Sequence, residues 1–153
     1  MSISVSESTT VKKKVQVWIY SQDRKAGNTQ ILLLKTIEER GGFWQPVTGS
    51  VEEGEDLLDA ALREATEETG LSFEGKVFFL DHSFEYEKKG VRFHEYGYAL
   101  QKNFLEEGPP RIRLDAHEHQ AYQWVSASVA RTQVHFDSNR HILDVLLMRL
   151  RTK

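Results

Sequence analysis

Gly49–Leu71 reads GSVEEGEDLLDAALREATEETGL and contains a short amphipathic helix with an acidic face. At about 100° of rotation per residue, Glu64, Glu67 and Glu68 fall within an arc of roughly 100°. A second group of residues lies on a separate side and is expected to pack against a sheet: Leu58, Leu62, Ala65 and Thr69. Like charges three or four residues apart destabilise a helix by a few tenths of a kcal/mol per pair. The acidic face is therefore better explained if it binds a cation.

The residues around this helix indicate where it begins and ends. Glu55 and Asp56 place negative charge at the positive end of the helix dipole, and Gly70 supplies a left-handed C-terminal cap. The sequence therefore predicts a helix from about Asp56 to Thr69. Because so short a helix is marginal alone, it needs a sheet beneath it, which would hold the three glutamates on a rigid base. Mg²⁺ prefers hard oxygen ligands in near-octahedral geometry, so the acidic face is a candidate magnesium site.

The spacing of glycines and charged residues resembles the Nudix box of the Nudix hydrolases. Five residues separate Gly49 from Glu55, seven separate Glu55 from Arg63, and the chain continues as EATEETGL to Leu71. A solvated acidic helix with ordinary ion pairs explains neither the glycine at each end nor the arginine among the acids. The resemblance covers roughly residues 13–151. It implies the Nudix fold, an α/β (α+β) protein built as an α/β/α sandwich with a mixed central sheet.

The resemblance also implies roles for these residues. The acidic face (Glu64, Glu67 and Glu68) would bind Mg²⁺, for which Mn²⁺ can substitute, and a backbone carbonyl near Gly49 would complete the metal ligands. Arg63 would orient a catalytic glutamate, and Glu55 would pair with Arg63 and so brace the loop and the helix. Metal ions neutralise the polyanionic substrate so that water can attack phosphorus. The chain is accordingly expected to be a pyrophosphohydrolase.

Glu118 is a candidate for a further catalytic and metal-binding carboxylate. It lies in a loop just before a Tyr-x-Trp-like strand, from which the family often supplies an acid that reaches across the cleft. An exposed loop glutamate is the alternative interpretation, and Glu95 in a hairpin strand is a second candidate for the remote acid. A transition-metal pair formed by His117 and His119 is disfavoured, because their spacing is weak evidence in a chain without cysteine.

Residues outside the Nudix box determine the substrate in this family. The stretch FWQPVTGSVEEGE at 43–55, the pattern EHxAYxW at 118–124 and Ser138-Asn139-Arg140 resemble the bacterial dihydroneopterin triphosphate pyrophosphatases. The Trp-Gln-Phe-Pro-Gln-Gly-Gly lead-in of bacterial RNA 5′-pyrophosphohydrolases is absent. However, residues 86–94 are shorter than the arginine-rich insertion that the pterin enzymes carry there.

Five residues are expected to bind the substrate, with aromatic rings stacking on a purine or pterin and basic groups binding phosphates: Phe43, Trp44, Tyr86, Lys88 and Arg92. Packing in the core or cleft wall is the alternative for the rings, and solvated surface is the alternative for the basic groups.

The expected function is Mg²⁺-dependent hydrolysis of a nucleoside- or pterin-type 5′-triphosphate, either dihydroneopterin triphosphate or a (d)NTP, with release of pyrophosphate. One alternative is removal of pyrophosphate from the 5′-triphosphate end of mRNA. The open, basic hairpin favours this alternative, whereas the net charge of −3 disfavours it. A nucleotide-binding Nudix module without catalysis is a second alternative. It is disfavoured because no acidic residue of the box is missing.

Length and composition fit one small enzyme. The 153 residues suggest a flexible N-terminal tail at 1–12 followed by a single domain at 13–153. Cysteine is absent, which excludes disulfides and a thiol nucleophile. No signal-peptide-like or membrane-spanning apolar run occurs, so a soluble cytoplasmic protein is expected, with a small-molecule substrate, no membrane partner and a homodimer as one possible assembly.

Hydrophobic patterns predict the elements that surround the motif helix. The expected strands are 15–20, 31–34, 77–80, a hairpin of 83–87 and 91–100 that turns at Lys88-Lys89-Gly90, and 123–125. The segment 23–29 is expected to be a hairpin loop, and 139–151 a helix. That helix presents an apolar stripe to the core: Ile142, Leu143, Leu146, Leu147 and Leu150.

Overall fold

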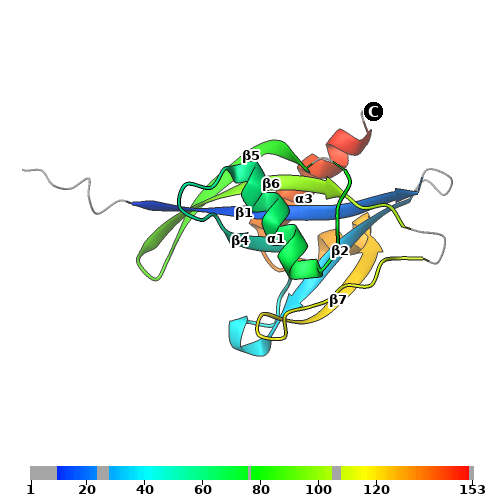
Figure 1. Ribbon diagram of the computed structural model, residues 1–153, viewed down its shortest axis with the longest axis horizontal. Helices are drawn as coiled ribbons and strands as arrows, with labels where there is room; N and C mark the ends of the chain where they lie inside the picture. The colour runs from blue at the N-terminus through cyan, green and yellow to red at the C-terminus, as the bar shows by residue number, and fades with distance from the viewer. Residues whose placement is uncertain (1–9, 24–27, 76, 105–107, 152–153) are drawn as a thin grey trace, which may run out of the picture.

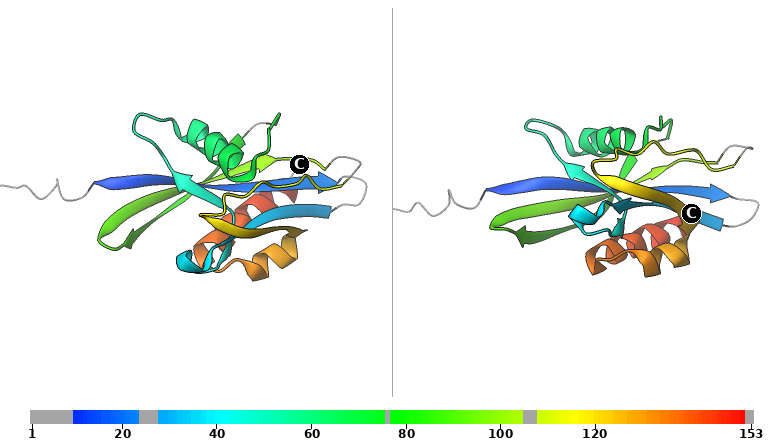
Figure 2. Two further views of the ribbon diagram at one scale, coloured as in Figure 1. Left: turned by 60° about the horizontal axis from the view of Figure 1, so that its bottom comes forward. Right: turned by 90° about the horizontal axis from the view of Figure 1, so that it is seen from below.

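The computed structural model describes residues 10–23, 28–75, 77–104 and 108–151, and in this part of the chain a mixed sheet lies between layers of helices (Figures 1 and 2). The seven strands are β1 (Val11–Asp23), β2 (Asn28–Thr36), β3 (Trp44–Gln45), β4 (Val47–Ser50), β5 (Val77–Lys88), β6 (Val91–Gln101) and β7 (His119–Ser126). The helices are α1 (Leu57–Thr69), α2 (Ala127–Gln133), α3 (Asp137–Arg151) and the 3-10 turn η2 (Glu38–Arg40). In Figure 2, α1 lies on one face of the sheet and α2 and α3 on the other. The predicted α/β/α sandwich with a mixed sheet is confirmed.

Strand β1 is the centre of the sheet. It runs parallel to β6 and antiparallel to both β2 and β4, which pair with different halves of it. The main path of hydrogen-bonded strands is β3-β2-β1-β6-β5, and β7 pairs with β2. Because β4 carries Gly49 and pairs with the N-terminal half of β1, the start of the sequence motif is fixed to the sheet.

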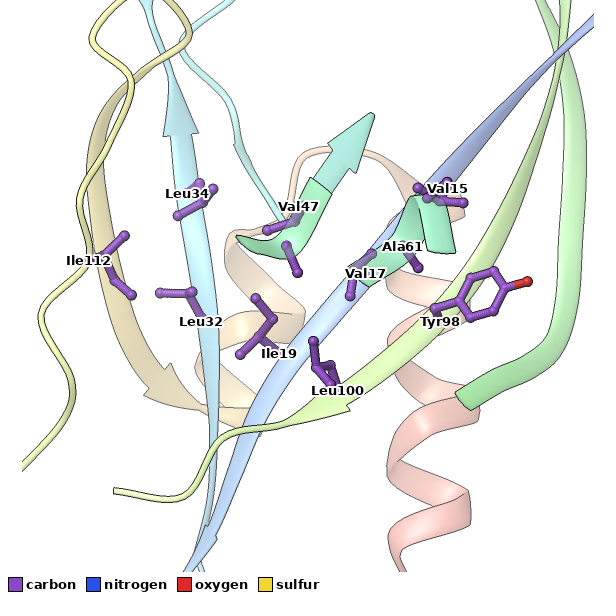
Figure 3. Close-up of a cluster of buried hydrophobic side chains, with 12 residues drawn as sticks. Val15, Val17, Ile19, Leu32, Leu34, Val47, Ala61, Tyr98, Leu100 and Ile112 are labelled. Carbon is purple, nitrogen blue, oxygen red and sulfur yellow. The ribbon is translucent and has the colours of Figure 1, made fainter. Parts of the chain in front are cut away.

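Side chains of β1 alternate between two hydrophobic cores, as expected for a strand with helices on both sides. Val15, Val17 and Ile19 point towards α1, and this core is shown in Figure 3. Trp18 and Tyr20 belong to the second core, which α3 covers. The predicted strand at 31–34 behaves in the same way, since its four residues divide between the two cores and all are buried.

Helix α1 has the predicted ends but only part of the predicted core face, since Ala65 and Thr69 are buried as expected. It begins after Asp56 and ends at Gly70, which has a positive φ of 72°. The expectation that Leu58 and Leu62 face the core is wrong, since they are 42% and 40% exposed. Beside the predicted Ala65, the helix buries Ala60 and Ala61, and these small side chains let its backbone approach the sheet closely.

The C-terminal helix packs as predicted. In α3, Ile142, Leu143 and Leu146 are buried, and the remaining two residues of the apolar stripe are partly buried against the same core. The sequence did not predict α2, β3, β4 or η2, all of which are short. The hairpin of β5 and β6 turns where expected, although β5 begins at Val77 as one strand with an irregularity between Phe79 and Ser83. Among the described helices, none is long and apolar enough to cross a membrane.

The N-terminal segment differs from the expected tail. Strand β1 begins at Val11, so residues 11 and 12 belong to the sheet and not to a flexible tail at 1–12. Residues 1–9 and residues 24–27 of the expected loop lie outside the described part of the chain.

Candidate active site

A cavity of about 320 Å³ lies where α1, β4 and the loop before β7 meet. Four carboxylates from two distant parts of the sequence line it: Glu64, Glu67, Glu68 and Glu118. Gly49 of β4 also lines it, and Lys14 and Arg40 are its two basic side chains. The residues expected to bind metal therefore line one cavity.

Arg63 links the helix to the chain segment before it. Its Nε and Nη2 atoms donate to the two carboxylate oxygens of Glu55 at 2.8 and 2.9 Å, and Nη2 also donates to the carbonyl oxygen of Ser50 at 2.9 Å. The hydrogen bonds from Arg63, followed by that from the backbone N–H of Glu52, lower the pKa of Glu55 to about 2. Such paired N–H donors fix the orientation of both planar groups. The pairing of Glu55 with Arg63 that the motif suggested is present.

The same guanidinium also reaches the acidic face. Arg63 Nη1 donates to Glu64 Oε2 at 3.2 Å and to Glu67 Oε1 at 3.1 Å. The two carboxylates differ in exposure, since the Glu64 side chain is largely buried and that of Glu67 is 59% exposed. Burial raises the pKa of Glu64, and Arg63 opposes this effect.

Gly49 leaves room for Glu64. A Cβ atom built at position 49 would lie 2.0 Å from Cδ of Glu64 and 2.2 Å from its Oε2. Such distances are far inside van der Waals contact. The glycine that opens the motif is therefore required because the Glu64 carboxylate rests directly on the backbone of β4.

Glu68 and His119 are buried side by side at this cavity. Nδ1 of His119 lies 3.6 Å from Oε2 of Glu68, and both side chains are at most 5% exposed. Burial, followed by the negative charges of Glu118 and Glu64, raises the pKa of Glu68 to about 8. Burial lowers the pKa of His119, which favours the neutral imidazole at pH 7. Glu118 itself lies 3.7 Å from Nη1 of Arg40.

These residues fit a hard divalent cation. The cavity is lined by carboxylate oxygens and by backbone of β4, which are the ligand types that Mg²⁺ and Mn²⁺ use. Within the described ranges, no ion pair joins Glu68 to a lysine or arginine, and the charge of Arg40 opposes only part of the rise in the pKa of Glu68. No three His, Cys, Asp or Glu side chains in this part of the chain already stand at metal-binding spacing, and Arg63 occupies the carboxylates of Glu64 and Glu67. Binding of a cation therefore requires small shifts of these side chains.

None of the five residues expected to bind substrate lines the cavity. Phe43 stacks on the ring of His135 at 3.9 Å, and Trp44 packs against the core beneath α3. Tyr86 donates a hydrogen bond to Glu95, and Arg92 pairs with Glu85. The remaining one, Lys88, ends β5 at the tip of the hairpin. Their role in substrate binding stays a prediction.

Glu95, the second candidate for the remote acid, does not line the cavity either. It is buried on the sheet, where it accepts hydrogen bonds from Gln16 at 2.8 Å and from Tyr86 at 3.0 Å. Its charge is thus satisfied by neutral donors away from the four carboxylates.

The sequence interpretation missed three ionisable residues of the cavity wall. Lys14 comes from β1, Arg40 from η2 and His119 from the first position of β7. Lys14 reaches the site because it pairs with Ser50 across β1 and β4. Strand pairing of this kind leaves no local signal in the sequence. For His119 the available signal was its position next to Glu118.

The raised pKa of Glu68 predicts how pH affects the metal-free protein. An acid whose pKa rises from the ordinary 4.5 to about 8 on folding releases its proton on unfolding between these values. Stability is therefore lost as pH rises from about 4.5 to about 8, and the loss stays constant above that. With a chelator present, we expect Glu68→Gln to raise Tm relative to wild type at pH 9 and to have little effect at pH 4.5. An equal Tm difference at both pH values would contradict the assignment of this pKa.

Comparison with known proteins agrees with the motif and the fold. The family model of the NUDIX domain matches residues 12–146. The chain is 32% identical over 137 residues to dihydroneopterin triphosphate diphosphatase of Escherichia coli, covering 85% of this chain and 88% of the relative. The solved structure of the E. coli dihydroneopterin triphosphate pyrophosphohydrolase matches with a TM-score of 0.74 and 29% identity, over 92% of this chain and 99% of that one.

Two further similar proteins carry names of different activities. A Caenorhabditis elegans Ap4A hydrolase structure matches with a TM-score of 0.72 and 26% identity, over 94% of this chain and 100% of that one. An octanoyltransferase of Myxococcus xanthus is 36% identical over 119 residues, which is 72% of this chain but only 30% of that protein. The family model covers most of the chain, and this chain therefore belongs to the Nudix hydrolase family.

Proposed function

We propose that this chain is a Mg²⁺-dependent pyrophosphohydrolase that cleaves a pterin- or nucleoside-type 5′-triphosphate and releases pyrophosphate. Nudix hydrolases generally need a divalent cation. The observation that carries the proposal is the single cavity lined by four carboxylates, with Lys14 and Arg40 in its wall. Carboxylates suit the metal, and the two basic side chains suit the phosphates that the metal alone does not neutralise.

The chemistry follows from this arrangement. A bound divalent cation supplies Lewis-acid neutralisation of the phosphate oxygens, so that water can approach phosphorus. Glu64, Glu67, Glu68 and Glu118 would hold the cation, and one of these carboxylates would take the proton of the attacking water. A P–O bond forms to the water oxygen while the bond to the leaving pyrophosphate breaks. Arg63 keeps Glu64 and Glu67 in place through the contacts described above.

Similarity to the E. coli diphosphatase supports dihydroneopterin triphosphate as the substrate. Similarity to the C. elegans enzyme supports a second candidate, a dinucleoside tetraphosphate such as Ap4A. Both are phosphoric anhydrides, so the same carboxylates serve either reaction. The RNA 5′ end as substrate, the homodimer and the preference for Mg²⁺ over Mn²⁺ stay predictions from the sequence.

A side-by-side assay tests the proposal. Purified protein is incubated with Mg²⁺ and, separately, with dihydroneopterin triphosphate, GTP, Ap4A and a 5′-triphosphorylated RNA, and released pyrophosphate and nucleotide are quantified. Highest kcat/KM with the pterin, accompanied by pyrophosphate release, is the expected result. Highest kcat/KM with Ap4A would favour the second candidate, whereas nucleotide binding without turnover would support the non-catalytic module.

Gly49→Ala tests the role of the contact between β4 and Glu64. The new Cβ overlaps the end of the flexible Glu64 side chain, so the carboxylate must move away while the backbone keeps its course. Because misplacing a catalytic group by about 1 Å can cost up to ~100-fold, we expect kcat to fall by about 10- to 100-fold with little change in Tm. Steady-state kinetics and thermal unfolding measure the two effects.

Gly75→Ala is the matched control for this substitution. Gly75 is exposed, and a Cβ there would lie 3.4 Å from its nearest neighbour, the carbonyl oxygen of Gln101. We expect its kcat and Tm to equal those of wild type. Unchanged kcat in Gly49→Ala would show that the position of Glu64 is unimportant for turnover.

A further inference from the structure

His119 has a buried ring nitrogen that is left without a partner. Its Nδ1 atom is inaccessible to solvent and makes no hydrogen bond in the described part of the chain. An unmade hydrogen bond at a buried polar atom costs free energy, so such an atom calls for an explanation. A carboxylate oxygen, Oε2 of Glu68, lies 3.6 Å from it.

The backbone around His119 is held firmly. His119 and Glu118 both donate their N–H groups to the carbonyl oxygen of Asp115 at 2.9 Å, and the carbonyl of Glu118 accepts from Ile37 at 3.0 Å. His119 also pairs with Thr36 across β2 and β7. The imidazole is thus attached to the sheet, while Glu68 belongs to the last turn of α1. A bond between the two would hold a helix carboxylate in place relative to the sheet.

The present distance is too long for a hydrogen bond, and a shift of roughly 0.7 Å in either side chain would close it. A neutral imidazole carries one N–H, and the tautomer with hydrogen on Nδ1 supplies the donor. Glu68 has two carboxylate oxygens, so one can accept from His119 while the other faces the cavity. Histidine and carboxylate partners commonly orient metal-binding groups in this way.

We propose that His119 is a positioning residue, whose Nδ1–H donates to Oε2 of Glu68 and so presents the other carboxylate oxygen to a divalent cation. The proposal rests on the proposed function, because it assigns His119 a task in that same cavity. His119 itself does not touch the substrate or the cation. Its effect is therefore expected on cation affinity and kcat, with little change in KM for the triphosphate.

Three substitutions separate donation by Nδ1 from simple packing. His119→Asn places an amide N–H near the position of Nδ1, His119→Gln places it near Nε2, and His119→Leu fills the space without a donor. Mn²⁺ affinity is measured by calorimetry on the protein without substrate, and kcat and KM are measured separately. We expect His119→Leu and His119→Gln to weaken Mn²⁺ binding and lower kcat by about 10- to 100-fold, and His119→Asn to stay within about 3-fold of wild type.

His117→Leu is the control, because this neighbouring imidazole is 97% exposed; we expect wild-type affinity and kcat. A packing role for His119 predicts the reverse order, with the Leu variant retaining affinity and the Asn variant losing it, and that order would overturn the proposal. If the Leu variant does not fold, equal Mn²⁺ affinity in the Asn and Gln variants would overturn it as well.

The outcome also distinguishes this proposal from the proposed function. Wild-type protein that neither binds Mn²⁺ nor hydrolyses any of the triphosphates would overturn both. Wild-type protein that binds and hydrolyses normally, beside a His119→Leu variant with the same affinity and kcat, would overturn the role of His119 alone.

Discussion

Glu68→Gln is expected to lower kcat by about 1,000-fold, a loss comparable to removing a group that stabilises transition-state charge. Glu68 is the most buried of the four carboxylates in the cavity. When this carboxylate is ionised, its negative charge attracts a cation strongly, because little water is present to screen the attraction. Glutamine keeps the size and shape of the side chain but removes that charge. The variant should therefore fold normally, bind Mn²⁺ weakly and show almost no turnover in Mg²⁺.

The control for this variant is Glu53→Gln, which removes the same charge from an exposed turn close to the motif helix. Its kcat should equal that of wild type, so a loss confined to Glu68→Gln reports the site and not the net charge. Full activity of Glu68→Gln in Mg²⁺ would refute its assignment as a metal-binding acid. Measuring thermal unfolding on the same preparation as turnover and Mn²⁺ calorimetry excludes misfolding as the cause of a loss.

The sequence predicts the motif helix and the sandwich well because their signals are local. The helix ends depend on Asp56 and Gly70, and the bond between Glu55 and Arg63 is implied by the resemblance of this stretch to the Nudix box. The two-sided core of β1 and β2 follows from runs of apolar residues. In each case the interacting residues are close in sequence, or the pattern repeats along one element.

The wrong predictions, and the features that the sequence did not predict, depend on packing between distant segments. Helical periodicity places Leu58 and Leu62 on an apolar side, but the alanines beside them allow the helix to lie closer to the sheet and leave both leucines outside. Lys14 lines the cavity only because β1 pairs with β4. No pattern in the sequence predicts that strand pairing. Arg40 depends on a three-residue turn that is too short to predict.

The aromatic residues illustrate the same limit. Phe43 and Trp44 lie a few residues before the motif and are predicted to stack on the base of the substrate. In the folded chain Phe43 contacts His135 and Trp44 packs against the core that α3 covers, so that role stays a prediction. Proximity in sequence to the carboxylates therefore did not bring these rings to the cavity. Which surface receives the base of the substrate depends on strand order, and that order emerges only in the folded chain.

Arg63→Ala is expected to lower both activity and stability. Arg63 contacts Glu55, Glu64 and Glu67 together, as well as the carbonyl of Ser50. Its loss leaves three carboxylates close to one another without their cation. We expect kcat to fall by at least about 100-fold through displacement of Glu64 and Tm to fall by roughly 5 °C.

Arg63→Lys should rescue little of this loss. A guanidinium donates in several directions within one plane, whereas a single ammonium cannot reach both oxygens of Glu55, the Ser50 carbonyl and Glu64 at once. Arg131→Lys is the matched control, because Arg131 of α2 pairs with both oxygens of Asp144 of α3 at 2.8 and 3.1 Å. Both helices lie on the far side of the sheet from α1 (Figure 2). This control should change kcat by less than about 2-fold, as expected for an exposed ion pair.

A double-mutant cycle then shows whether Arg63 acts through Glu55 or directly on the acidic face. If its main task is to fix the loop, Glu55→Gln should lower kcat nearly as much as Arg63→Ala, and the double variant should be no worse than Arg63→Ala alone. If Arg63 acts mainly on Glu64 and Glu67, Glu55→Gln should cost far less and the two effects should add. The guanidinium donates at 2.8 and 2.9 Å to Glu55 but at 3.1 and 3.2 Å to the other two carboxylates, so we expect the non-additive result.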